Sequence, residues 1–209
     1  MIDICPTITT NHPHTYREQM ERIAPFATRV HIDLSDGEFT PNKLIPADQI
    51  WWPGGMRADL HVMYKRPFDY LDVLVALGPQ LIIVHAEAEG DFLTFAQRLH
   101  HHGIEAGVAL LPDTKPEIIK PGLEFIDHVL IFSGNLGHQG GSEANLALLD
   151  KVSAIKSLKP TIEVSWDGGV NDKNAVQLVQ GGIEVLNVGS YIQSAPDAQQ
   201  AYTALRELI

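Results

Sequence analysis

Several features that would assign this chain to a specialised class of protein are missing or scarce. It contains one cysteine, Cys5, so no internal disulfide can form. No apolar run reaches the roughly 18 residues that a membrane-spanning helix needs. Residues 1–4 lack the basic segment, followed by an apolar one, that begins a secretory signal. These absences predict a cytoplasmic protein with no membrane partner.

Positive charge is also scarce. The chain has 15 Lys and Arg against 26 Asp and Glu, which gives a formal net charge of −11 at pH 7. An acidic surface repels the phosphates of nucleic acids and anionic membranes, so we expect neither as a partner. A small phosphorylated molecule is still compatible with this charge, because backbone amides can hold a phosphate.

The chain is long enough to bury a core of its own. It has 209 residues, 44% of them hydrophobic, and no linker or low-complexity segment interrupts it. We therefore expect residues 1–209 to form one catalytic domain.

Strand patterns alternate with helical patterns along the chain. We predict eight strands, at residues 2–8, 28–34, 57–63, 81–85, 105–110, 128–132, 161–166 and 184–188. Helices are predicted at residues 16–24, 67–77, 90–102, 115–120, 143–157 and 171–180 and from about residue 195, with a short helix within 46–55. Such a series predicts an α/β fold, a single (β/α)8 TIM barrel, and a doubly wound open sheet is the competing interpretation.

Polar side chains lie at or near the carboxyl ends of four predicted strands. They are His31 and Asp33, then His61, His85 and Asp167. In a closed barrel these strand ends converge on one axis, whereas an open sheet spreads them over its width. The distribution of these residues therefore favours the barrel.

Four of these residues form a plausible ligand set for a metal. His31 and Asp33 are two apart in a strand, so their side chains share one face. With His61 and Asp167 they offer two imidazoles and two carboxylates, which suit one divalent cation such as Zn²⁺, Fe²⁺, Mn²⁺ or Co²⁺. Taken singly, each is better explained as a polar group at a strand end. The combination predicts a metal site.

Four segments resemble a known family. They read TRVHIDLSDGEFTPN (residues 28–42), DLHVM (59–63), IEVSWDGGV (162–170) and VGSYI (188–192). In this order and spacing the chain resembles the ribulose-phosphate 3-epimerases, from residue 5 to its last helix. The resemblance implies a barrel of the ribulose-phosphate-binding type, in which His31, Asp33, His61 and Asp167 bind one divalent metal.

The resemblance also implies an activity. It is that of an isomerase of carbohydrate metabolism which inverts C3 of a ketose phosphate, most simply D-ribulose 5-phosphate to D-xylulose 5-phosphate in the pentose phosphate series. Such an inversion needs a base on one face of the sugar, an acid on the other, and positive charge to stabilise the enediolate. We predict that Asp33 and Asp167 are the two acid/base groups and that the bound metal stabilises the enediolate.

Glycines mark the predicted binding site of the substrate. The loops after strands seven and eight of such barrels often hold a phosphate on backbone amides, and neither loop carries Lys or Arg here. Glycine pairs also occur in ordinary turns, and a methionine in a strand is more often part of the core. The predicted substrate-binding residues are Gly168, Gly169, Gly189 and Ser190, the lid glycines Gly137, Gly140 and Gly141, and, by the resemblance, Thr7 and Met63.

Departures from the family pattern leave the substrate open. Thr7 stands in place of a serine and Ser35 in place of a methionine, and the lid reads NLGHQGG at residues 135–141 where the family commonly has NPGFGGQ. Ser165 and Trp166 are interpreted as two residues between the strand and the aspartate. A 3-epimerase of a hexulose 6-phosphate is therefore an alternative, because an altered lid is where sugar length would be sensed.

Two further classes of function remain. A decarboxylase or aldolase on the same barrel would need a lysine near the second or third strand, and Lys43 and Lys65 lie beyond the ligand positions. A non-catalytic phosphate-binding barrel would not need all four ligands. We also expect a homo-oligomer. His85 either supports a ligand or is a core histidine, and Asp59 either orients a ligand or makes a structural hydrogen bond.

Overall fold

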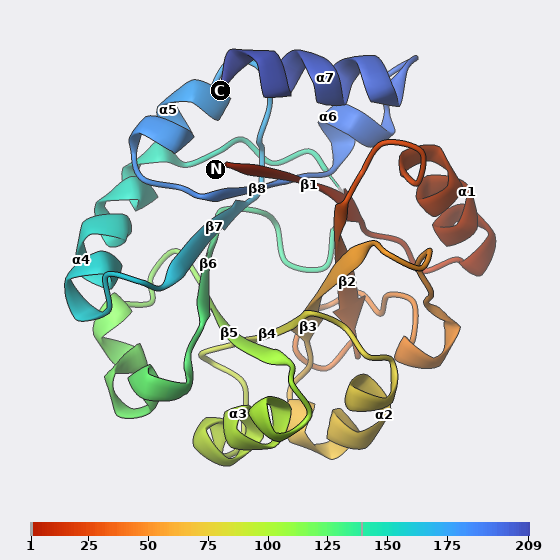
Figure 1. Ribbon diagram of the computed structural model, residues 1–209. Helices are drawn as coiled ribbons and strands as arrows, with labels where there is room; N and C mark the ends of the chain where they lie inside the picture. The colour runs from red at the N-terminus through yellow and green to blue at the C-terminus, as the bar shows by residue number, and fades with distance from the viewer. Residues whose placement is uncertain (1, 139) are drawn as a thin grey trace.

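Eight parallel strands close into one barrel in the order β1 to β8, as a computed structural model of the chain describes for residues 2–138 and 140–209. In Figure 1 the strands ring the centre and the helices surround them. The strands are β1 (Asp3–Ile8), β2 (Arg29–Ser35), β3 (Arg57–Met63), β4 (Leu81–His85), β5 (Glu105–Leu110), β6 (His128–Phe132), β7 (Glu163–Asp167) and β8 (Val185–Val188). The predicted (β/α)8 barrel is confirmed and the open sheet is wrong.

The connecting segments include both α-helices and 3₁₀ turns. The α-helices are α1 (Pro13–Ile23), α2 (Leu71–Ala76), α3 (Phe92–His101), α4 (Asp150–Leu158), α5 (Ala175–Gln180), α6 (Ser190–Gln193) and α7 (Ala198–Leu208). The 3₁₀ segments are η1 (Ala47–Gln49), η2 (Pro67–Tyr70), η3 (Pro116–Phe125) and η4 (Leu146–Leu149). The helix predicted at 115–120 is thus 3₁₀ helix, with Pro121 inside it. The one predicted at 143–157 begins later, at η4.

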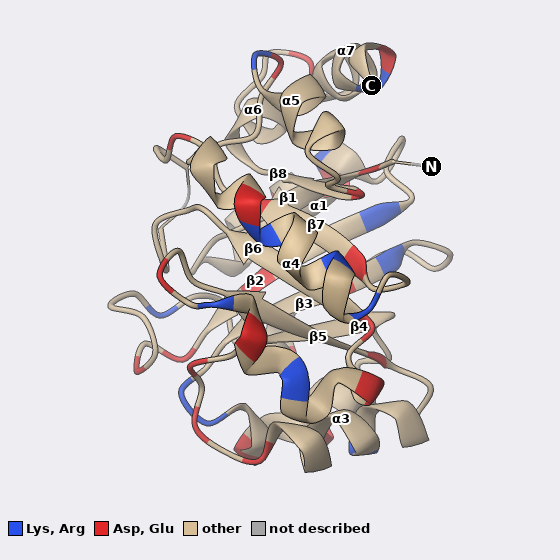
Figure 2. Cartoon of the chain, turned by 90° about the vertical axis from the view of Figure 1, so that its left-hand side faces the viewer, with Lys and Arg blue, Asp and Glu red and all other residues tan. Residues whose placement is uncertain are grey.

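Local chemistry sets where these helices begin. The Asp91 carboxylate accepts hydrogen bonds from the backbone N–H of Leu93 and Thr94, which caps α3. Asp197 caps α7 in the same way through the N–H of Gln200. Charges of both signs lie on the helices and loops around the barrel (Figure 2). No helix among the described residues has the length and hydrophobicity needed to cross a bilayer.

The strands are buried on both sides, and this decides which side chains face the barrel interior. Along β2, Ile32 and Leu34 pack outward in the main core, so the alternating His31 and Asp33 point inward. A small separate cluster of Leu81, Ile83, Ala109 and Leu130 fills part of the interior. The polar groups of the interior are therefore supported on one side by packed apolar side chains.

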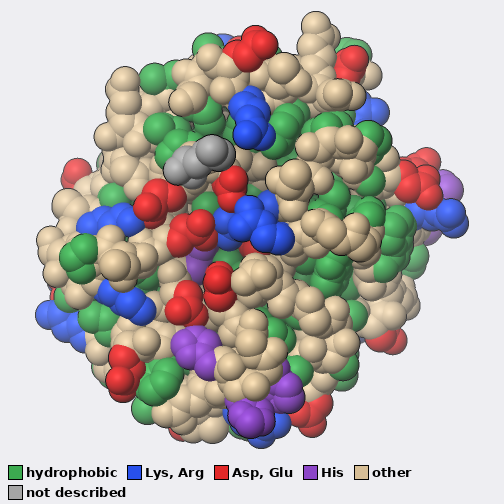
Figure 3. Space-filling view, viewed as in Figure 1, with side chains coloured by type: hydrophobic (Ala, Val, Ile, Leu, Met, Phe, Trp, Pro, Cys, Tyr) green, Lys and Arg blue, Asp and Glu red, His purple; other side chains and the backbone are tan. Residues whose placement is uncertain are grey.

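The amino-terminal end of the barrel is closed by ion pairs around Arg29, whose side chain is 4% exposed. The Arg29 guanidinium donates to Asp59 at 2.7 Å, to Glu163 at 2.8 Å and to Asp3 at 3.2 Å. Acidic and basic side chains gather over the barrel on this face (Figure 3). Because Asp59 is bound to Arg29, the structural interpretation of Asp59 is favoured over a role beside the ligands.

Candidate metal and substrate site

Four residues from β2, β3 and β7 come together as the sequence predicts, although His31 lies nearer the start of β2 than its carboxyl end. The Nδ1 of His61 lies 2.8 Å from Asp33 Oδ1, and the Nε2 of His31 lies 3.3 Å from the same oxygen. Both of these nitrogens lie 3.9 Å from Asp167 Oδ2. One ligand atom of each residue lies within 4.8 Å of those of the other three.

Strand register explains how residues from three strands meet. On the neighbouring strands β2 and β3, Asp33 is paired with His61 and His31 with Asp59, so one carboxylate and one imidazole stand side by side. Asp167 ends β7, which is separated from β2 around the closed barrel by two strands, β8 and β1. Closure of the barrel therefore completes the cluster.

The cluster could hold a divalent cation. Donors of one ion at about 2.1 Å lie at most about 4.2 Å apart, and the measured separations are close to this range. His31 Nε2 is fully buried and has no hydrogen-bond partner among the described residues. A buried imidazole nitrogen that faces two carboxylates without a hydrogen bond is what a metal ligand requires.

The two carboxyl groups of the cluster have opposite pKa shifts. Burial raises the pKa of Asp33, but the imidazoles of His31 and His61 outweigh burial and hold this pKa well below its usual range. Burial and the negative charge of Asp33 raise the pKa of Asp167 to about 6. Neighbouring carboxyl groups whose pKa values are pushed apart are typical of an acid and base pair.

Thr9 is a site residue that the sequence reasoning missed. Its hydroxyl donates a hydrogen bond of 2.5 Å to Asp33 Oδ2, which leaves the other oxygen of Asp33 to face the two imidazoles. The available signal was its position two residues after Thr7, directly beyond the end of β1 at Ile8.

A small cavity of about 50 Å³ opens beside the cluster. Asp33 and Asp167 line the cavity, whereas Gly141 does not. The predicted substrate-binding residues in its lining are Thr7, Met63, Gly137, Gly140, Gly168, Gly169, Gly189 and Ser190. The lining residues that were not predicted include Thr9, Phe132, Asn135, His138 and Asn187.

Two of the lining glycines are required by the close approach of the loop after β6. Gly168 has φ +116°, and a Cβ added there would lie 2.3 Å from the backbone nitrogen of Gly134. Gly169 has φ +72°, and its added Cβ would lie 2.3 Å from the backbone nitrogen of Ala144. These glycines therefore let two backbone segments pack together, and their predicted role in phosphate binding stays a prediction.

Asn42 forms a hydrogen bond with the lid that follows β6. This residue follows β2, and its Nδ2 donates to the carbonyl oxygen of Gly137 at 3.1 Å. The same nitrogen lies 3.1 Å from Nε2 of His138. Of the predicted lid at residues 135–141, residue 139 lies outside the described residues.

The interpretation of Ser165 and Trp166 as residues between strand and ligand is wrong. Both belong to β7, which runs to Asp167 in register with β6. Trp166 is fully buried and its Nε1 donates to the carbonyl oxygen of Gly168, while Ser165 lies 2.6 Å from Nε2 of His128 in the barrel interior. Side chains alternate between the two faces of the strand without a break along β7, and Asp167 is the last residue of this strand.

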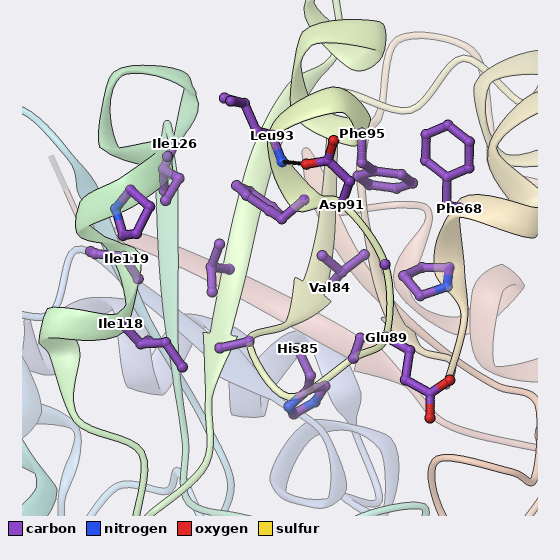
Figure 4. Close-up of a pocket in the computed structure, with 18 residues that line it drawn as sticks. Phe68, Val84, His85, Glu89, Asp91, Leu93, Phe95, Ile118, Ile119 and Ile126 are labelled. Carbon is purple, nitrogen blue, oxygen red and sulfur yellow. Dashed lines mark hydrogen bonds between the residues drawn. The ribbon is translucent and has the colours of Figure 1, made fainter.

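A second cavity, of about 400 Å³, lies outside the barrel between α3 and η3. Figure 4 shows Phe68 and Phe95 on one side and Ile118 and Ile119 on the other. Asp91, which also lines this space, caps α3 by accepting a hydrogen bond from the backbone N–H of Leu93 (Figure 4). The lining of this space is largely apolar and includes His85, Glu89 and Asp91 but none of the four residues of the cluster, so the candidate site is the cluster at the barrel axis.

Comparison with known proteins agrees with this geometry. A model described as the ribulose-phosphate 3 epimerase family matches residues 3–193. The chain belongs to this family. The resemblance seen in the sequence is confirmed, and so is the expectation of an isomerase.

Individual relatives cover most of the chain. The ribulose-phosphate 3-epimerase of Helicobacter pylori (strain J99) is 32% identical over 86% of this chain and 85% of its own length. The protein of the same name from Bacillus subtilis is 29% identical over 85% of both chains. That of Schizosaccharomyces pombe is 27% identical over 99% of this chain and 93% of its own.

Solved structures extend the likeness of fold. A 3-hexulose-6-phosphate synthase from Salmonella typhimurium has a TM-score of 0.74 and 14% identity, covering 99% of this chain and 98% of that one. A phosphoribosyl anthranilate isomerase from Thermus thermophilus has a TM-score of 0.69 and 13% identity, with full coverage of both chains. At these identities the likeness shows the fold alone, so activity is argued from the epimerase family and from the site.

Proposed function

We propose that this chain is a metal-dependent epimerase that inverts C3 of a ketose phosphate, most simply between D-ribulose 5-phosphate and D-xylulose 5-phosphate. The observation that carries the proposal is the cluster of two imidazoles and two carboxylates beside the cavity. His31, Asp33, His61 and Asp167 would hold one divalent cation. When bound, this cation supplies the positive charge that a developing oxyanion requires.

Asp33 and Asp167 move the proton in this scheme. They reach the cavity from β2 and β7, and both line it. Asp33 comes from β2 and Asp167 from β7, so one carboxylate can accept the C3 proton while the other side chain delivers a proton to the opposite face. The roles exchange when the other epimer is the substrate. Thr9 positions Asp33 through its hydrogen bond.

The glycine-rich rim would hold the phosphate. Gly168 and Gly189 lie in the cavity lining at the ends of β7 and β8, and α6 begins at Ser190. No Lys or Arg is among the described residues of this lining, so backbone amides are the expected donors. The absence of lysine from this lining also disfavours an aldolase that works through a lysine amine.

The decisive experiment measures solvent-deuterium exchange at C3 for a panel of ketose phosphates, with the metal content of the protein measured in parallel. We expect exchange with ribulose 5-phosphate, its loss on chelation, and its return with Zn²⁺, Fe²⁺, Mn²⁺ or Co²⁺. Asp33→Asn and Asp167→Asn should each reduce turnover by roughly 10²–10⁴-fold, the usual contribution of one acid/base group. Full activity in either variant would remove that residue from the scheme.

The lid gives one reason to include a longer sugar in the panel. His138 lines the cavity from the lid and lies within 3.1 Å of Asn42. We expect the additional carbon of a longer sugar to bring it closer to His138 in this lining. Faster turnover of a hexulose 6-phosphate than of ribulose 5-phosphate would favour this second candidate, and release of an aldehyde or of carbon dioxide would replace both with a lyase.

A further inference from the structure

Asn187 is a buried polar residue without a described partner. It lies within β8 between the buried Leu186 and Val188 and is 2% exposed. Neither its Oδ1 nor its Nδ2 has a hydrogen-bond partner among residues 2–138 and 140–209. Burying a carboxamide that makes no hydrogen bond is unfavourable, and such groups in native proteins usually serve a ligand or water.

The position of Asn187 points to a ligand. Its Cα is in register with Asp167 on β7 and with Cys5 on β1, so it stands at the level of the candidate acid/base group. Asn187 also lines the same cavity as Asp167. Gly189 follows two residues later, about 7 Å further along the strand, at the predicted phosphate end.

Thr7 provides a second observation of the same kind. It lies on β1, the neighbour of β8, is 3% exposed, and lines the cavity. Its hydroxyl Oγ1 also has no hydrogen-bond partner among the described residues. Two adjacent strands thus present unpaired polar groups to one small cavity, between the carboxylates and the glycine rim.

We propose that Asn187, with Thr7, hydrogen-bonds the C4 hydroxyl of the substrate and thereby selects ketose phosphates that carry a hydroxyl at this carbon. The inference rests on the proposed function, which places C3 at Asp33 and Asp167 and the phosphate near Gly189. In a pentulose 5-phosphate, C4 is the carbon between them. A carboxamide can donate to and accept from one hydroxyl, and the Thr7 hydroxyl can do the same.

The test compares two substrates in one variant. Asn187→Leu keeps the side-chain size and removes both hydrogen-bonding atoms. We expect kcat/KM for D-ribulose 5-phosphate to fall at least tenfold, while kcat/KM for the 4-deoxy analogue changes less than twofold. A merely structural role of Asn187 would lower both equally. Thr7→Val should act in the same direction. Leu186→Met, on the outward face of the same strand, should change neither.

A binding measurement separates this inference from the proposed function. Xylitol 5-phosphate keeps the C4 hydroxyl and the phosphate but has no ketone, so it cannot be epimerised. Calorimetric titration should show at least tenfold weaker binding to Asn187→Leu than to the natural protein. If the natural protein epimerises no ketose phosphate, the proposed function fails, and the titration still tests Asn187.

Two results would overturn the proposal. One is an equal loss on both sugars, and the other is unchanged binding of xylitol 5-phosphate by a folded Asn187→Leu protein. Where the melting temperature shows that the leucine variant does not fold, Asn187→Ala enters the same comparisons, because it also lacks both hydrogen-bonding atoms and is smaller.

Discussion

His61 and His85 meet through their Nε2 atoms at 2.9 Å. One of the two nitrogens must donate and the other accept. Because Nδ1 of His61 faces the carboxylates and would bind the cation, the proton of His61 belongs on Nε2, and His85 accepts with its own Nε2. The remaining proton of His85 then sits on Nδ1, 3.5 Å from Glu87 Oε2. Burial lowers the pKa of His85 to about 4, which keeps it neutral as this arrangement requires.

This pair predicts that His85 tunes the metal site without touching the ion. Replacing it with leucine leaves Nε2 of His61 without an acceptor and frees the ring to rotate. We expect the affinity for Zn²⁺ to fall about 10–100-fold, as is usual when the hydrogen-bond partner of a ligand is removed. Competition with a chromogenic chelator measures this affinity. His101→Leu, at an exposed position on α3, is the control, and equal affinities in the two variants would contradict the prediction.

At Gly168 we expect the steric clash of an added Cβ to lower stability by an amount that can be separated from the strain of a positive φ. Gly168→Ala places a Cβ 2.3 Å from the backbone of Gly134, whereas Gly141→Ala, also at positive φ, meets nothing within 4 Å. We expect the Gly141 variant to lose about 1 kcal/mol and the Gly168 variant to lose at least 2 kcal/mol more. Urea unfolding of both proteins checks the difference. Equal losses of unfolding free energy in the two variants would contradict the prediction, because the loop after β6 would then move away from the Cβ at no cost.

Much of the fold and part of the site follow from local sequence patterns. Alternation within one strand places His31 and Asp33 on one face, and barrel closure brings Asp167 to them, so the four members of the cluster could be found without coordinates. Asn187 could not be found in this way. A single polar residue in an apolar strand does not reveal from the sequence whether its side chain has a hydrogen-bond partner. The Asn42 contact to Gly137 is also invisible to local patterns, since it joins loops 95 residues apart.

The buried ion pair between Arg29 and Asp59 predicts that replacing Arg29 lowers the free energy of unfolding strongly. Arg29→Met would leave the buried carboxylate of Asp59 without its cation, and breaking such a buried pair costs about 3–5 kcal/mol. The double variant Arg29→Met, Asp59→Leu should recover part of this loss, because the buried carboxylate of Asp59 is then absent. Arg57→Met is the control: its side chain is 49% exposed and its pairing with Asp3 should contribute about 1 kcal/mol or less. Denaturant unfolding of the natural protein, Arg29→Met, Asp59→Leu and the double variant gives the coupling energy, and additive losses would contradict the prediction.

The same end of the barrel predicts how stability depends on pH. Burial raises the pKa of Glu163, but hydrogen bonds from His128 and Arg29 outweigh burial and hold this pKa well below the ordinary value of 4.5. Because the pKa is lower in the folded than in the unfolded state, the stabilisation is complete above about pH 4.5 and is lost as the pH falls below it.

Glu163→Gln removes this dependence on pH. We expect the variant to have a lower melting temperature than the natural protein at pH 7 and a difference that shrinks steadily from pH 5 to pH 2. Melting temperatures measured across this range, with Glu124→Gln at an exposed position of η3 as the control, check the expectation. A difference between the Glu163 variant and the natural protein that stayed constant down to pH 2 would mean that the carboxylate charge does not stabilise the fold. The loss at pH 7 would then belong to the changed hydrogen bonds alone, since the amide of glutamine keeps the shape of the side chain but does not titrate.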